Sequence, residues 1–238
     1  MKNKCFLYLW LTIASLIIST SATAQVNVFF DLLYEINFLF GFEGEPRARD
    51  TEFTNYPYDL YDDGRYRPIG EEGRNISTKA QLLFQSNERE LFGGYGQIQF
   101  SPISTITLDL NHRQLFEDRL RDDNFRRGIS NFSFQYNRIR TRKFNLWWDV
   151  GLSRLNSEDD INWGISGGAG LSWFFKQPLS AHLNYRYHDF LDGSQDGLSE
   201  LNLKLQLHLN RYFISAGYQN LSNAVRANSW MMGGGVYF

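Results

Sequence analysis

The sequence predicts an all-β protein, a transmembrane antiparallel up-and-down β-barrel of ten or twelve strands. Apolar and polar residues alternate in successive segments from residue 78 to the C-terminus, which is typical of strands with one apolar and one polar face. Many segments run for ten or more residues, the length that a strand tilted by about 45° needs to cross a bilayer. The connections alternate between short turns and longer charged loops, as they do in membrane barrels.

Residues 1–24 have the layout of a secretory signal peptide. Lys2 and Lys4 precede an apolar stretch over residues 5–18, and small residues follow it, so we expect cleavage after Ala24. A retained anchor is the alternative, but the apolar stretch is short for a hydrocarbon core of ~30 Å. The only cysteine lies in this segment. The exported chain is therefore expected to have no disulfide and no thiol ligand or nucleophile.

Charge and length set the next limits. The formal charge is −2, and removal of Lys2 and Lys4 takes it to −4 (−2 minus 2), so we expect no basic surface for nucleic acid. About 210 residues remain, which is enough for one domain. We divide the chain into the signal segment, an N-terminal segment over 25–77 and a barrel over 78–238.

Ten strands follow from the alternation. Their apolar positions run over residues 80–84, 98–100, 106–110, 132–136, 144–152, 163–173, 179–187, 201–209, 212–220 and 230–238. Trp and Tyr gather near strand ends, as in the aromatic girdles of membrane proteins. A soluble β-sandwich or lipocalin-like barrel also alternates, but sandwich strands usually have about five or six residues.

The segment over 201–209 shows the two faces most clearly. Leucine occupies every second position there, while Glu200, Asn202, Lys204, Gln206 and His208 form the other series. We expect the leucines to face lipid and the polar series to face the interior. Closure into a barrel is then required, because an open edge would leave backbone groups unpaired in hydrocarbon.

The region before residue 78 leaves two alternatives. Residues 26–42 keep strand alternation, but a helix would gather their polar residues on one face; Val, Ile, Phe and Tyr favour the strand. A strand there would need a return strand near 48–58 and would give twelve strands; otherwise ten strands follow an N-terminal arm or plug. The acidic, tyrosine-rich stretch 56–73 could bind a partner or cation, or be an ordinary solvated loop.

The ionisable residues of the inward series are the candidate lumen lining. A hairpin at 191–197 would place Arg186 opposite Glu200 and tie the wall together. Such charges either satisfy one another in a narrow barrel or line a water-filled path; Gly164, Gly168 and Gly170 on the same face favour an open space nearby. The predicted lumen-lining residues are Asp109, Asp149, His182, Arg186, His188, Glu200, Lys204 and His208.

The C-terminus adds a resemblance. The chain ends "GGGVYF", which resembles the C-terminal signature of Gram-negative outer-membrane β-barrel proteins, whose terminal Phe is read by the barrel-assembly machinery. The resemblance covers roughly residues 78–238 and is one of class, without a particular family. It implies a location in the outer membrane, outer-membrane lipid around the barrel, and the assembly machinery as a partner through Phe238.

Two resemblances to enzymes are less complete. Residues 218–238 are similar to the final hairpin of lipid A deacylases, where His-x-Ser-Asn precedes the last strand; Ser222 matches, but Asn220 replaces the histidine, and a serine without a base is a poor nucleophile. His188, Asp189 and Asp192 resemble groups of omptin-type proteases, although adjacent strand residues point to opposite faces.

We therefore expect no catalytic residue, cofactor or metal site. The expected role is a small channel or a structural or assembly component of the cell envelope. A barrel-embedded hydrolase of lipid or peptide and a surface binding module that works through acidic loops are the alternatives.

Overall fold

The computed structural model describes residues 51–59, 64–68, 73–87, 91–117, 125–157, 160–191, 197–223, 225 and 227–238. All of them belong to one compact unit, Pro46–Phe238. The predicted signal segment and the ambiguous segment 26–42 lie outside the described residues.

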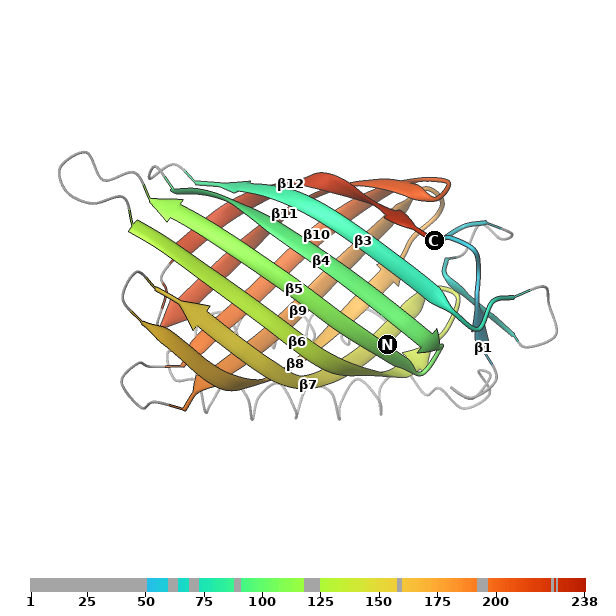
Figure 1. Cartoon of the computed structure of the whole chain (residues 1–238). Coiled ribbons are helices and arrows are strands. Elements are labelled where there is room, and N and C mark those ends of the chain that lie inside the picture. Colours follow the sequence, from blue (N-terminus) through green and yellow to red (C-terminus); the bar gives the residue numbers. More distant parts are fainter. Residues whose placement is uncertain are drawn as a thin grey trace, which may run out of the picture. The chain divides into compact units, whose positions relative to one another are not determined.

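The fold is a closed barrel of ten antiparallel strands, as predicted (Figure 1). Each strand pairs with its neighbours in sequence, and the last strand pairs with the first to close the ring. The strands are 10 to 16 residues long. Their bounds are β3 (Ser77–Ser86), β4 (Leu91–Ile103), β5 (Ile106–Glu117), β6 (Phe125–Arg140), β7 (Phe144–Asn156), β8 (Ile161–Phe174), β9 (Leu179–Phe190), β10 (Leu198–Leu209), β11 (Tyr212–Asn223) and β12 (Ala227–Tyr237).

The outer wall of the barrel is apolar. Leu203, Leu205 and Leu209 of β10 are exposed on the outside, while Gln206 and His208 between them are buried. The aromatic residues near strand ends also point outward, with Trp163 58% and Trp230 66% exposed. This confirms the predicted faces of the strands. Among the described residues, no helix is long and apolar enough to span a membrane.

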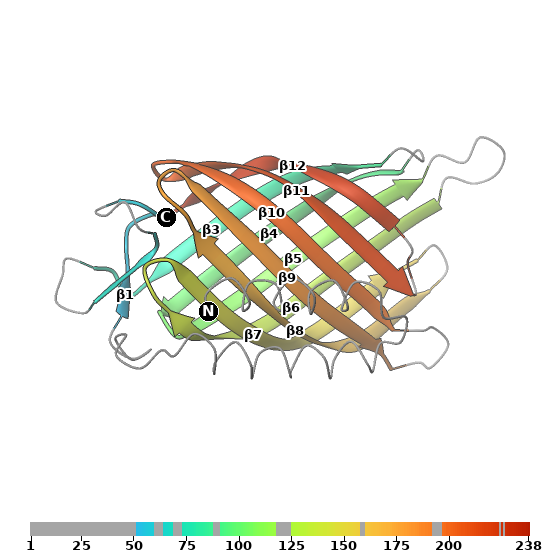
Figure 2. The same cartoon turned by 180° about the vertical axis from the view of Figure 1, so that it is seen from behind.

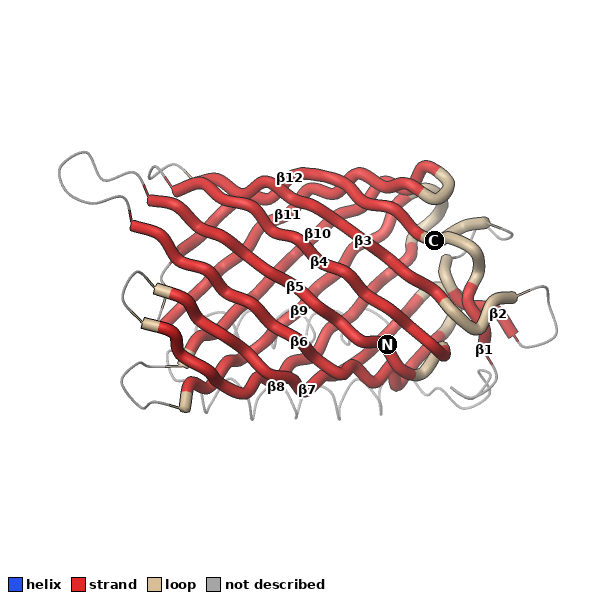
Figure 3. Tube along the Cα trace, viewed as in Figure 1, coloured by secondary structure: helices blue, strands red, loops and turns tan. Residues whose placement is uncertain are grey.

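The barrel has two distinct ends. The turns after β4, β6, β8 and β10 are short and lie at the end that holds the C-terminus, here called the short-turn end (Figure 3). The turn between β10 and β11 needs only two residues, and Asn210 adopts a left-handed conformation there (φ 57°), which asparagine tolerates well. The connections after β3, β5, β7, β9 and β11 lie at the opposite end, the long-loop end, which holds the two longest connections, those after β5 and β9.

A separate two-stranded sheet shows that the twelve-strand alternative is wrong. β1 (Thr51–Phe53) lies where the return strand was sought, but it pairs with β2 (Tyr66–Pro68). The barrel has no free edge to accept it, because β3 is already paired with both β12 and β4. β1 and β2 lie near the C-terminus at the short-turn end (Figure 2).

Candidate functional site: the barrel interior

The structure places all eight predicted lumen-lining residues on the inward face of the strands. Their side chains come from β5, β7, β9 and β10, where inward positions recur every second residue. Six are buried and two, His182 and Lys204, are partly buried; the six are Asp109, Asp149, Arg186, His188, Glu200 and His208.

One ionic cluster lies in the middle of the barrel around Arg186. The guanidinium of Arg186 lies 2.6 Å from Asp149 Oδ2 and 3.3 Å from Asp109 Oδ2. Asp109 also accepts hydrogen bonds from Gln97 (2.6 Å) and Asn111 (3.0 Å). Burial of two carboxylates is therefore offset by one shared cation and by neutral amide donors.

A second ionic cluster centres on Glu200. Arg113 on β5 donates to both of its carboxylate oxygens, at 2.8 and 3.3 Å. Asn202 and Gln219 donate to the same carboxylate (2.5 and 3.3 Å), and His188 Nε2 lies 3.5 Å from Glu200 Oε2. This bidentate pair joins opposite walls of the barrel.

The predicted opposition of Arg186 and Glu200 is correct in register, since they are direct cross-strand partners. They nevertheless do not pair with each other: Arg186 pairs with two aspartates, and Glu200 pairs with Arg113. Arg113 was missed by the sequence analysis, although the alternation of Asp109 and Asn111 extends to it by one further step. The alternation along β5 therefore already indicated that Arg113 faces the interior.

The glycines of β8 do not leave an open space. Trp147 also has inward parity and is buried, and its ring occupies the room beside Gly170. A Cβ at Gly170 would lie 2.4 Å from Trp147 Cζ2, and one at Gly168 would lie 3.1 Å from Asp149 Oδ1. The expectation of an open space is corrected: the missing side chains accommodate an indole ring and part of an ionic cluster.

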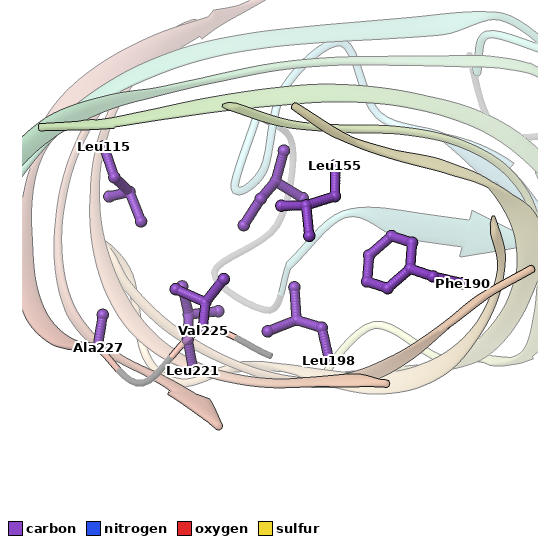
Figure 4. Close-up of a cluster of buried hydrophobic side chains, with 8 residues drawn as sticks. Leu115, Leu155, Phe190, Leu198, Leu221, Val225 and Ala227 are labelled. Atoms are coloured by element: carbon purple, nitrogen blue, oxygen red, sulfur yellow. The ribbon is translucent and has the colours of Figure 1, made fainter. Parts of the chain in front are cut away.

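An apolar cluster fills the interior near the long-loop end (Figure 4). Its side chains point inward from seven strands and from the connection before β12, and all are buried. We call it the apolar plug: Leu115, Ile129, Leu155, Phe190, Leu198, Leu221, Val225 and Ala227.

An aromatic layer lies at the short-turn end. The Tyr58 ring lies 5.4 Å from the His208 ring and 6.0 Å from the Phe174 ring, and the Tyr58 hydroxyl donates to the Leu179 carbonyl. Phe213 contributes a further ring beside His208. Tyr58 thus inserts from the segment before β2 into the mouth of the barrel.

The strands β1 and β2 cover this mouth, and we call residues 51–58 and 64–68 the lid. The Arg65 guanidinium lies over the rings of Phe53 (5.0 Å) and Tyr237 (5.5 Å) and donates to Ser77 Oγ (3.1 Å). Thr51 accepts from Arg140 Nε (3.0 Å). The lid is thus fixed to β3, β6 and β12 by polar and aromatic contacts.

Two of the three tyrosines of the lid are packed inside the protein, and Tyr56 is partly buried. Tyr58 and Tyr66 are buried, and burial raises the pKa of the Tyr66 phenol. The expectation that residues 56–73 form an ordinary solvated loop is therefore wrong for the described part of that stretch. Apolar contact with the barrel rim explains why tyrosine recurs there.

Among the described residues, the side chains singled out for the two hydrolase alternatives are not brought together. Ser222 has outward parity, and within the described part of the chain no histidine or acid forms a hydrogen bond with it; His188 bonds Ser153 Oγ at 2.6 Å instead. His188 is buried inside whereas Asp189 is exposed outside. Asp192 lies outside the described residues. No group of three or more metal-ligating side chains occurs among the residues described.

Comparison with known proteins gives little beyond the fold. No family model and no curated protein matches the chain. Among solved structures, the N-terminal β-barrel domain of Pseudomonas aeruginosa OprF overlaps with a TM-score of 0.36 at 14% identity, over 68% of this chain and 97% of that one. The outer membrane protein OprG of the same organism gives 0.36 and 12%, over 68% and 94%.

A loop L8 deletion mutant of OmpT, an outer membrane protein of Vibrio cholerae, gives a TM-score of 0.38 at 10% identity, over 79% of this chain and 74% of that one. Overlaps this low carry no argument about activity. The closed barrel, its strand lengths and its apolar outer wall are features of this chain itself. By these features the chain has the fold of a transmembrane antiparallel β-barrel.

Proposed function

We propose that the protein is an integral outer-membrane barrel with a sealed interior, which serves as a structural or anchoring component of the cell envelope. The observation that carries the proposal is the burial of interior side chains at three successive levels. The apolar plug, the two ionic clusters and the aromatic layer follow one another from the long-loop end to the short-turn end.

A water-filled path would leave its lining side chains accessible. Instead Asp109 is 1%, Arg186 2% and His188 0% exposed. The buried guanidinium groups of Arg113 and Arg186 are each paired with buried carboxylates, as expected where hydration is excluded. Lys204 and His182 are partly buried, but the apolar plug and the lid lie on either side of their level. This arrangement favours a sealed barrel over a solute channel.

Location in a bilayer is supported by the outer wall. Large apolar side chains on most strands are half exposed or more, including Leu82 (75%), Val150 (55%) and Leu205 (57%). In water such a continuous surface would favour aggregation. In hydrocarbon it is the expected surface of a barrel.

Planar-bilayer recording tests the sealed interior. The mature chain, refolded in detergent, should insert without conductance steps, and heat-modifiable mobility on gels should show that the inserted protein is folded. A variant with the plug truncated, Phe190→Ala with Leu198→Ala, provides the comparison, because it removes two buried side chains at the long-loop end. Steps in the unaltered protein that change with Arg186→Gln would overturn the proposal in favour of a channel.

A further inference from the structure

A cleft lies on the outer wall of the barrel near the long-loop end. Its volume is about 290 Å³, and it is lined by Gln114, Arg126, Gly128, Asn156 and Ser157. Gly128 opens the floor of the cleft, since a Cβ there would lie 3.2 Å from Gln114 Oε1 and 3.6 Å from Asn156 Cβ. The cleft is thus formed by side chains of β5 and β7 on either side of a bare position of β6.

The cleft begins where the apolar band of these three strands ends. Leu110, Phe132 and Leu152 form the last apolar cross-strand row. The next outward rows are polar, and they lie at the level of the lipid headgroups if the apolar band lies in hydrocarbon. These rows are His112, Ser130 and Arg154, followed by Gln114, Gly128 and Asn156.

Two arginines lie at or beside the cleft: Arg126 lines it, and Arg154 occupies the neighbouring outward row. The Arg126 guanidinium lies 5.5 Å from the Phe116 ring, and the Arg154 guanidinium lies 5.7 Å from the Trp163 ring. Arg154 Nε is buried and has no hydrogen-bond partner among the described residues. The outward positions of β5, β6 and β7 that the structure describes include no carboxylate. Among the residues that the structure describes, no carboxylate forms an ion pair with either guanidinium.

We propose that this cleft binds the phosphorylated headgroup of an anionic lipid of the outer leaflet. Guanidinium groups bind phosphate through paired N–H donors, and the amides of Gln114 and Asn156 can bond neighbouring hydroxyl or amide oxygens. The exposed face of Trp163 offers apolar contact to an acyl chain, which a free phosphate would not use. The inference rests on the proposed function, because only in a membrane does this wall meet lipid.

Lipid binding to the detergent-solubilised full mature barrel can be measured by native mass spectrometry. Bisphosphorylated lipid A is the probe, and the same lipid after enzymatic dephosphorylation is the comparison. The variant is Arg126→Gln with Arg154→Gln. The matched control is Arg138→Gln, which changes an exposed arginine near the other end of β6.

We expect the double variant to weaken binding by roughly tenfold for each arginine, and the control to bind as the unaltered protein does. Dephosphorylated lipid should bind unaltered protein as weakly as bisphosphorylated lipid binds the double variant. Equal binding by the double variant, or of the dephosphorylated lipid, would overturn the proposal. Displacement of the lipid by millimolar inorganic phosphate would also overturn it, in favour of a phosphate site.

A folding control separates this inference from the proposed function. If heat-modifiable mobility shows a folded barrel in vesicles, but the double variant binds phosphorylated lipid as strongly as the unaltered protein does, only the cleft proposal fails. If the mature chain remains monodisperse in buffer without detergent, the membrane barrel fails, and the cleft proposal with it.

Discussion

Replacement of Arg186 by methionine tests whether the barrel interior excludes water. The side chain lies 2.6 Å from Asp149 and 3.3 Å from Asp109. At an effective dielectric constant of about 20, these distances correspond to gross attractions of about 6 and about 5 kcal/mol, and in bulk water to about a quarter of each. Desolvation of the three groups cancels much of this, but the two carboxylates would remain buried without their cation.

We therefore expect Arg186→Met to lower the free energy of unfolding by about 3–5 kcal/mol, the usual cost of breaking a buried ion pair. The assay is reversible urea unfolding in detergent micelles or vesicles, followed by tryptophan fluorescence. Adding Asp109→Asn and Asp149→Asn removes both orphaned charges and should restore more than half of the loss. Arg138→Met, at an exposed position, should change stability by less than about 0.5 kcal/mol.

A loss below about 1 kcal/mol for Arg186→Met would refute the reasoning. That value is typical of ion pairs exposed to water, and it would mean that the centre of the barrel is hydrated. The sealed interior would then have to be abandoned.

Three further predictions concern the wall, the interior and the lid. Leu205→Arg should lower the free energy of unfolding by about 2–4 kcal/mol in vesicles if the position lies near mid-membrane, and a neutral effect would place the leucine face outside lipid. Gly170→Val should cost about 1–3 kcal/mol by overpacking, because its Cβ meets the Trp147 ring; Gly170→Val with Trp147→Ala should recover part of the loss. Burial raises the pKa of the Tyr66 phenol, so the neutral phenol stabilises the folded state. This contribution to the free energy of unfolding is complete below the ordinary pKa of about 10, and it is lost as the pH rises toward the pKa of the folded state. Urea unfolding should show a lower free energy of unfolding at pH 11 than at pH 9, and Tyr66→Phe should reduce this difference. If the difference is the same in the variant, the burial of a neutral Tyr66 phenol is contradicted.

Strand alternation determined much of the fold. The period of two sets which face each side chain occupies, so the ten strands, the outward leucines and the inward ionisable series of β10 could be read from the sequence. The same rule places Arg113 one step beyond Asn111, and it places Trp147 between Asn145 and Asp149 on the inward face of β7.

The pairing of interior groups could not be found in this way. Arg113 and Glu200 are 87 residues apart and lie on opposite walls, and their contact depends on how far the strands tilt and stagger when the sheet closes. Whether the glycines of β8 would leave a space depended on the Trp147 ring of the neighbouring strand.

By itself, the sequence determined the strand count from residue 78, the two faces of the wall and the class of the barrel, because these follow from local periodicity. Only the tertiary structure decided that β1 and β2 pair with each other at the short-turn end, and that an apolar plug fills the other end. It also decided which charges meet across the interior. Those features depend on contacts between residues distant in the chain, which exist only after the barrel has closed.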